Sequence, residues 1–270
     1  MSSISTTSPD ADIILLPTGD GAVEIHAHRC ILSAASPFFK TMFSLPQKDA
    51  GGIQVIPLPE SPSVVDTLLQ LIYPVPDPLI SSLGELVDIL AAATKYDCVA
   101  PIASLRRTLI SPSFLREEPT RVYAIACRFD LQEEARIASQ YTLDVNVLDC
   151  PLSEDLRHIS AYSYHQLLDL HRRRGRAALG LLKAGDEIKC MQCNGNSFSV
   201  YSSPKWWSEF EKRAKEELRA RPTSNIIFTM EFLSEVANAG GCVRCPGSVL
   251  NSHRYLTKLK ESIDALPATI

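Results

Sequence analysis

The stretch that decides the fold runs from Asp12 to Phe43 and reads DIILLPTGDGAVEIHAHRCILSAASPFFKTMF. A short apolar run at residues 12–16 ends at a turn that contains proline and glycine. Residues 22–27 then alternate apolar and polar side chains, which is the period of a half-buried strand. The two runs predict a pair of strands joined as a hairpin.

Two short helices are expected directly after the hairpin, over residues 28–35 and 37–43. Ser36 is a favoured N-cap residue, and Pro37 suits the first position of a helix. Further elements are predicted downstream: a strand at 53–56, a helix that opens at Ser61-Pro62, and helices at 83–95 and 99–109. Core candidates among these segments are Leu32, Phe39, Phe43, Leu69 and Ile72, each worth about 1.5–3 kcal/mol on burial.

The quoted stretch resembles the opening of BTB/POZ domains. In that family an Asp starts a strand, and a His-basic-x-apolar-Leu element precedes a Ser-Pro-x-Phe helix start. The matching residues here are Asp12, His28-Arg29-Cys30-Ile31-Leu32 and Ser36-Pro37-Phe38-Phe39, and later Leu68-Leu69-Gln70-Leu71-Ile72-Tyr73 and Ala93-Thr94-Lys95-Tyr96. The resemblance implies an α+β fold, with a three-stranded sheet covered by at least five helices, and a function in binding other proteins.

The variant is similar to one that is common in fungi, particularly basidiomycetes. Its marks are Tyr73-Pro74, followed by further prolines, and the segment that begins at Glu118-Pro119 and reaches Phe129. The resemblance therefore predicts a fungal BTB-domain group.

The chain is expected to contain a folded BTB domain and two helical parts. No strand pattern is visible between about residues 111 and 187, so an all-α extension similar to a BACK domain is predicted there. The remaining residues predict a small helical module. The expected parts are a disordered tail at 1–11, the BTB/POZ domain at 12–111, the helical extension at 112–185 and the C-terminal module at 186–270.

The resemblance also implies interface residues. In BTB dimers a buried acid at the position of Asp12 and a base at the position of Arg29 line a pocket near the interface. His28 lies at the same junction, and we interpret it as a capping or core residue and not as a catalytic base for Cys30. Only eleven residues precede Asp12, so a swapped N-terminal strand is not expected, and the chain is predicted to be a monomer or a weak dimer.

Cullin-binding BTB adaptors carry an apolar-x-Glu motif after the helix that corresponds to residues 38–43. Here that position reads Leu45-Pro46-Gln47 and has no carboxylate. A role as substrate adaptor of a cullin ubiquitin ligase is therefore an alternative without support at its most informative position. An indirect transcriptional co-regulator is another alternative, as is an enzyme that uses C-terminal thiols, although we expect no catalysis.

Two C-x2-C units, Cys190/Cys193 and Cys242/Cys245, are the strongest chemical signal in the chain. Such units place two thiolates on one turn, as tetrahedral Zn²⁺ requires. The 48 residues between the units exceed the spacing of common zinc ribbons, so a folded helical insert is expected. We predict a structural zinc site, with free or redox-active thiols and disulfides as the alternatives.

Charge and hydropathy exclude several other classes of function. Residues 1–150 carry 10 Lys and Arg against 18 Asp and Glu, and residues 151–270 carry 17 against 13, which is too few basic residues to predict nucleic-acid binding. No secretory signal or membrane span is visible, so an intracellular protein is expected. The Arg172–Arg176 run is interpreted as a solvated helix face, and Trp206 and Trp207 as core.

Overall fold

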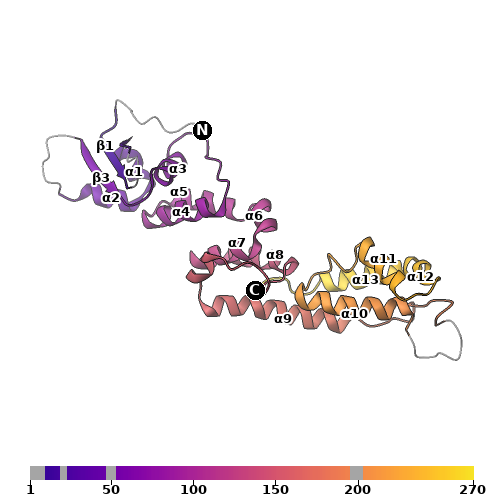
Figure 1. The fold of residues 1–270 in the computed structure, drawn as a ribbon. Helices are drawn as coiled ribbons and strands as arrows, with labels where there is room; N and C mark the ends of the chain where they lie inside the picture. The colour runs from indigo at the N-terminus through magenta and orange to yellow at the C-terminus, as the bar shows by residue number, and fades with distance from the viewer. Residues whose placement is uncertain (1–9, 19–22, 47–52, 195–202) are drawn as a thin grey trace. The chain divides into compact units, whose positions relative to one another are not determined.

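The structure is a computed structural model that describes residues 10–18, 23–46, 53–194 and 203–270. The chain forms two compact units, Met1–Leu115 and Arg116–Ile270 (Figure 1). The first unit contains a small sheet and helices, whereas the described part of the second is helical. Within the described ranges, no helix is both long enough and apolar enough to cross a membrane.

The sheet has three strands in the order β2-β1-β3. The central strand β1 (Ile13–Pro17) pairs antiparallel with β2 (Ile25–Ala27) and parallel with β3 (Gln54–Leu58). The predicted sheet is confirmed, but β2 begins at Ile25 and β3 continues to Leu58. Residue 22, where the second strand was expected to start, lies outside the described residues.

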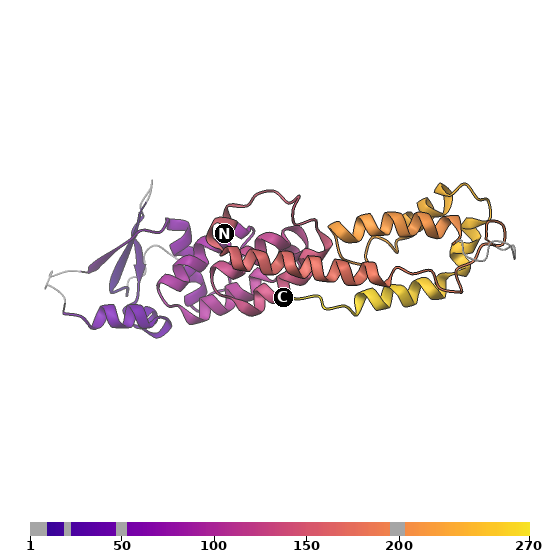
Figure 2. The same cartoon turned by 90° about the horizontal axis from the view of Figure 1, so that it is seen from below.

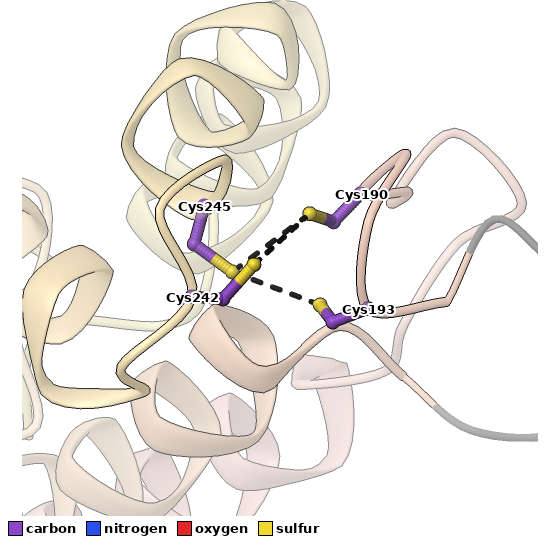
Figure 3. Close-up of side chains that lie close together, drawn as sticks. All are labelled: Cys190, Cys193, Cys242 and Cys245. Carbon is purple, nitrogen blue, oxygen red and sulfur yellow. Dashed lines mark hydrogen bonds between the residues drawn. The ribbon is translucent and has the colours of Figure 1, made fainter.

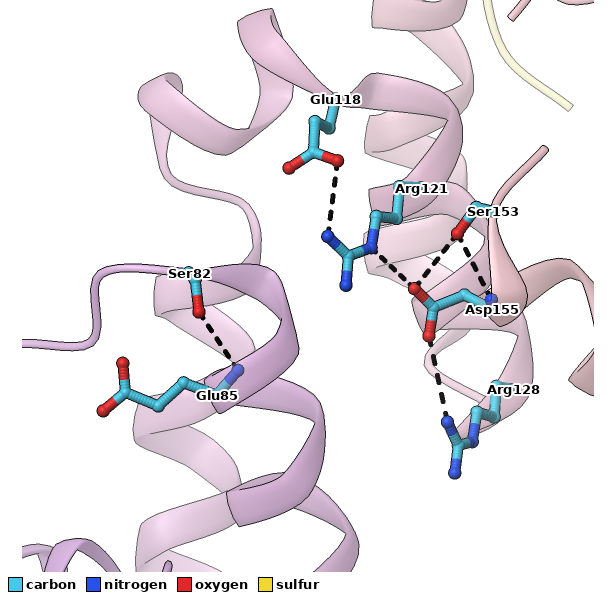
Figure 4. Close-up of polar contacts among 7 residues, drawn as sticks. All are labelled: Ser82, Glu85, Glu118, Arg121, Arg128, Ser153 and Asp155. Atoms are coloured by element: carbon cyan, nitrogen blue, oxygen red, sulfur yellow. Dashed lines mark hydrogen bonds and ion pairs between the residues drawn. The ribbon is translucent and has the colours of Figure 1, made fainter. Parts of the chain in front are cut away.

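Six helices follow or interrupt these strands in the described chain: α1 (Arg29–Ala35), α2 (Pro37–Ser44), α3 (Pro62–Ile72), α4 (Leu83–Lys95), α5 (Val99–Leu109) and α6 (Pro112–Glu117). Serine caps start three of them. The Oγ atoms of Ser36, Ser61 and Ser82 accept from the backbone N–H three residues later, and Figure 4 shows the cap at Ser82. The prediction of at least five helices is confirmed.

The core of the first unit lies on one face of the sheet. Ile13 and Leu15 of β1 are buried, whereas Ile14 between them is half-buried, as expected for a strand with one covered face. Leu32, Phe39 and Leu69 bring α1, α2 and α3 into the same interior. Of the predicted core residues, only Phe43 and Ile72 are half-buried.

The second unit is built from seven α-helices and two 3₁₀ helices in the described residues. They are α7 (Pro119–Arg128), α8 (Gln132–Tyr141), η1 (Thr142–Asp144), η2 (Glu154–His158), α9 (Ala161–Leu181), α10 (Lys205–Ala220), α11 (Met230–Ala239), α12 (Cys245–Asn251) and α13 (His253–Asp264). Ser160 caps α9, because its Oγ accepts from the N–H of Ser163 at 3.0 Å. Figures 1 and 2 both show α9 alongside α10.

One apolar cluster joins α9 to the helices that follow it. Ala178 and Leu182 at the end of α9 belong to the same cluster as Trp206, Trp207 and Phe210 of α10. Both indole rings are fully buried, which confirms the prediction that the two tryptophans are core residues. The expected division of this part of the chain at residue 185 stays a prediction.

Arg174 corrects the expectation that the whole arginine run is solvated. Arg172, Arg173 and Arg176 are exposed, but Arg174 is only 6% exposed. Its guanidinium donates to backbone carbonyls: Nε to Pro222 at 2.8 Å, Nη2 to Ile263 at 3.0 Å, and Nη1 to Leu266 and Pro267. A buried cation is tolerated here because each of its nitrogens has an acceptor.

A second buried charge, Asp155, ties η2 to α7 (Figure 4). One carboxylate oxygen accepts from Arg121 Nε at 2.7 Å and from Ser153 Oγ at 3.3 Å, and the other lies 3.8 Å from Arg128 Nη1. Burial opposes the charge of Arg121, but its hydrogen bond to the Asp155 carboxylate outweighs this effect and raises the pKa of the guanidinium. The network therefore fixes the otherwise irregular segment before α9.

Candidate functional site

The four paired cysteines come together in the second unit (Figure 3). The sulfur of Cys190 lies 3.8 Å from that of Cys242 and 4.0 Å from that of Cys245, and the sulfurs of Cys193 and Cys245 are 3.8 Å apart. All four sulfur atoms lie within 4.8 Å of one another. The predicted convergence of the two C-x2-C units is therefore confirmed.

These distances fit a tetrahedron of sulfur ligands. With Zn–S bonds of about 2.3 Å, tetrahedral geometry places the sulfurs roughly 3.8 Å apart. Cys190, Cys242 and Cys245 are buried and Cys193 is half-buried, so the centre of the cluster is shielded from water. All eight cysteines are free in the structure.

Each pair sits on a tight turn of the backbone. At the first, the N–H of Cys190 donates to Asn194 Oδ1 at 2.6 Å, and the N–H of Asn194 donates to the carbonyl of Cys190 at 3.2 Å. At the second, Gly241 takes a positive φ of 63°, which a glycine adopts without strain. The N–H of Cys245 then donates to the carbonyl of Cys242 at 3.1 Å, and α12 begins.

The first turn of α10 lies against the cluster. The N–H of Lys205 donates to the sulfur of Cys193 at 3.5 Å, and the N–H of Trp206 donates to the sulfur of Cys245. Helix N-termini favour negative charge, so this arrangement favours thiolates. Gly240 permits the approach, because a Cβ there would lie 2.9 Å from the Cβ of Lys205.

The thiols of the cluster differ in acidity. Burial opposes ionisation of Cys190, but hydrogen bonds from Ser248 and from the N–H groups of Cys193 and Gln192 lower its pKa to about 6. Burial raises the pKa values of Cys193 and Cys245, and neighbouring thiols add to the effect. Four adjacent thiolates would repel one another, so the full set of donors fits a cation that offsets their charge.

The donor set also limits the chemistry. Four soft sulfur ligands suit zinc, and together they complete its preferred coordination. A site of this kind leaves no position for water or substrate. The arrangement can therefore connect distant parts of the chain, and it is unsuited to zinc-dependent hydrolysis.

Asp12 and Arg29, the residues expected at an interface, lie close together in the first unit. The carboxylate of Asp12 accepts from the backbone N–H of Arg29 at 2.8 Å, at the start of α1. The guanidinium of Arg29 donates to Gln54 at 2.6 Å and lies 5.6 Å from the centre of the Phe43 ring. Asp12 is exposed in the single chain, and its burial at a dimer interface stays a prediction.

His28 is held in place by a neighbouring helix end. Its Nδ1 lies 3.1 Å from the hydroxyl of Tyr73, which also accepts from the backbone N–H of His28 at 3.0 Å. Its Nε2 lies 3.3 Å from the carboxylate of Asp10. These contacts are consistent with a structural role for His28 at the junction between β2 and α1.

The segment expected to carry a cullin contact is described only in part. Leu45 is 57% exposed and Pro46 is exposed, while Gln47 lies outside the described residues. Phe38, the second residue of α2, is 43% exposed. Apolar side chains are therefore exposed to solvent at both ends of α2.

Comparison with known proteins identifies the first unit. Residues 10–113 match the family model of the BTB/POZ domain. A search of curated proteins gave no match. The chain thus contains a BTB/POZ domain, a kind of domain that generally mediates protein–protein interaction, and the observed sheet and helices agree with the fold expected from the sequence.

Proposed function

We propose that this chain is a protein–protein interaction scaffold or adaptor that acts through its BTB/POZ domain. The observation that carries the proposal is the match of residues 10–113 to that family. We place the partner contact at α2, where Phe38 near the start of the helix and Leu45 just after its end leave apolar surface in water. Catalysis is not part of the proposal.

Affinity purification of the full chain with quantitative mass spectrometry tests this function. Leu45→Asp should lose the bound protein, because a carboxylate would have to be desolvated in an apolar contact. Leu79→Asp is the matched control, since Leu79 is 91% exposed in the same unit and lies outside α2. Equal recovery of every partner by the wild type and Leu45→Asp would contradict the proposed surface.

A cullin ligase adaptor is the first more specific form of this function. The exposed apolar end of α2 favours it, and the absence of a carboxylate in Leu45-Pro46-Gln47 weighs against it. Co-purification of a cullin, lost in Leu45→Asp, would support it. An indirect transcriptional co-regulator is the other form, and the resemblance to the fungal group remains a prediction beside both.

Self-association is proposed to involve α1 and the residues around it. Asp12, His28 and Arg29 surround the start of this helix, and Cys30 and Ala34 are exposed on it. A second copy could pack on this face as a weak dimer. Light scattering of Ala34→Arg and of the wild type tests this contact. If the wild type dimerises and Ala34→Arg has the same apparent mass, the proposed contact is wrong.

We further propose that Cys190, Cys193, Cys242 and Cys245 hold one structural zinc ion. The support is the set of sulfur distances near 3.8 Å and the burial of the cluster. Mass spectrometry under non-denaturing conditions should find one zinc per chain. Cys242→Ser should lose it, and Cys30→Ser, which changes an exposed cysteine outside the cluster, should keep it.

A further inference from the structure

An open groove of about 340 Å³ lies in the second unit, bounded by α11, α12 and α13. Each helix contributes one stripe of side chains. Met230, Leu233 and Ala237 come from α11, and Pro246, Val249 and Leu250 come from α12. These stripes follow helical spacing, so the groove is bounded by three helix faces.

The third wall differs in character. On α13 the lining residues are His253, Leu256, Thr257 and Lys260, which follow the i, i+3, i+4, i+7 pattern of one helix face. The two residues at the ends of this stripe can donate hydrogen bonds to a carboxylate. None of the lining residues is acidic. The groove therefore combines apolar surface on α11 and α12 with hydrogen-bond donors at both ends of the α13 wall.

Apolar side chains at the mouth of the groove remain in contact with water. Met230 is 70% exposed and Leu250 is 66% exposed, and they stand on two different walls. Flexible methionine side chains are common where a surface adapts to a bound helix. Apolar surface of this kind around a groove indicates a binding site more often than a free surface.

We propose that the groove binds one amphipathic helix of a protein partner, with two acidic residues seven positions apart and apolar residues between them. Seven residues of α-helix span about 10 Å. His253 and Lys260 are themselves seven residues apart on α13, so a helix laid alongside α13 brings its acids opposite both. The apolar residues of the partner helix, at the third and fourth positions after its first acid, then meet the apolar surface of the groove.

Lys260 is available for such a contact. It pairs with Asp264 at 2.7 Å, but both side chains are more than two-fifths exposed, and an exposed pair of this kind contributes little stability. A carboxylate from the partner would meet Lys260 in a site partly shielded from water, where the attraction is stronger. Binding therefore requires no rearrangement of the fold.

The groove is directly connected to the cysteine cluster. Cys245 is the first residue of α12, and only two residues separate Cys242 from the end of α11 at Ala239. A metal held there would set the distance between two walls of the groove. The inference rests on the proposed adaptor function, to which it adds a second protein-binding surface.

The test uses the full chain and a fluorescein-labelled, alanine-based peptide of about 16 residues. The peptide carries two glutamates seven positions apart, with leucines at the third and fourth positions after the first glutamate, and its twin has lysines in place of the glutamates. In a fluorescence anisotropy titration, the acidic peptide should bind at least about tenfold more tightly than the twin, a difference of about 1.4 kcal/mol. Lys260→Glu should reverse this preference.

Lys258→Glu is the matched control, because Lys258 is exposed on the same helix and does not line the groove. It should leave the preference unchanged. Equal binding of both peptides, absence of binding, or the same effect from both lysine variants would overturn the proposal. The proposal would also be overturned if the chain self-associated and Leu250→Asp separated the copies, whereas addition of the peptide did not. None of these outcomes alters the α2 experiment, so failure of the groove is distinguishable from failure of the adaptor function.

Discussion

Protonation of His171 should destabilise the second unit at acidic pH. The ring is largely buried on α9, and its Nε2 lies 3.1 Å from the hydroxyl of Thr142. Burial disfavours the charged ring and lowers its pKa from 6.5 to about 4. Because the folded chain then binds the proton less readily than the unfolded chain, the contribution to stability is complete above pH 6.5 and is lost as the pH falls toward 4.

The size of the effect follows from the difference between the two pKa values. One pKa unit corresponds to about 1.4 kcal/mol, so the full shift is worth roughly 3 kcal/mol, of which about 2 kcal/mol should be lost between pH 7 and pH 5. His171→Gln keeps a hydrogen-bonding group and cannot titrate. The free energy of unfolding of the wild type should therefore fall toward that of the variant over this range.

Urea denaturation at a series of pH values measures this difference. Both tryptophans of the chain lie in the second unit, so their fluorescence follows the unit that contains His171. Loss of metal from the cysteine cluster in acid affects wild type and variant alike and cancels in the comparison. His165→Gln, at an exposed position of the same helix, is the control. If the free energies of unfolding of the wild type and His171→Gln differed by the same amount at pH 5 and pH 7, the reasoning would be refuted.

Three further substitutions test the second unit. Arg174→Met removes the donors to four backbone carbonyls and should cost about 2–4 kcal/mol in urea denaturation, whereas the exposed Arg173→Met should cost less than about 1 kcal/mol. Asp155→Asn weakens contacts to two arginines and should lower stability by about 1–3 kcal/mol, with earlier proteolysis before α9 as the local readout. Cys242→Ser should make the tryptophan transition occur at lower urea, while hydrogen exchange in β1 and α4 stays at the wild-type rate. Equal loss of hydrogen-exchange protection in both units would contradict the expectation that they unfold independently.

Local signals explain why much of the fold was predictable. Ser36, Ser61 and Ser160 each precede a helix, and each serves as the N-cap, because the capping interaction depends only on residues three positions apart. The cysteine pairs were predictable for a different reason. Tetrahedral coordination requires four donors around one point, so two C-x2-C units imply convergence even across 48 residues.

Interactions that depend on tertiary structure were harder to predict. Arg174 was assigned to a solvated face because its neighbours are arginines, yet it falls on the buried stripe of α9 with Leu167, Leu170 and Ala178. That spacing was a usable signal, but its carbonyl acceptors come from Pro222 and residues 263–267, far away in sequence. The groove could not be predicted either, since it depends on how three separate helices are placed.

The wide separation of the cysteine pairs has a consequence for how the chain refolds. Zinc held by both pairs would close a ring of about 50 residues that contains α10 and α11. By the chain-entropy estimate used for disulfides, such a ring reduces the conformational entropy of the unfolded state and so raises its free energy by about 4 kcal/mol. A chain that retains its metal in denaturant would therefore begin folding with the ends of this segment already together. Zinc should then accelerate refolding more than it slows unfolding.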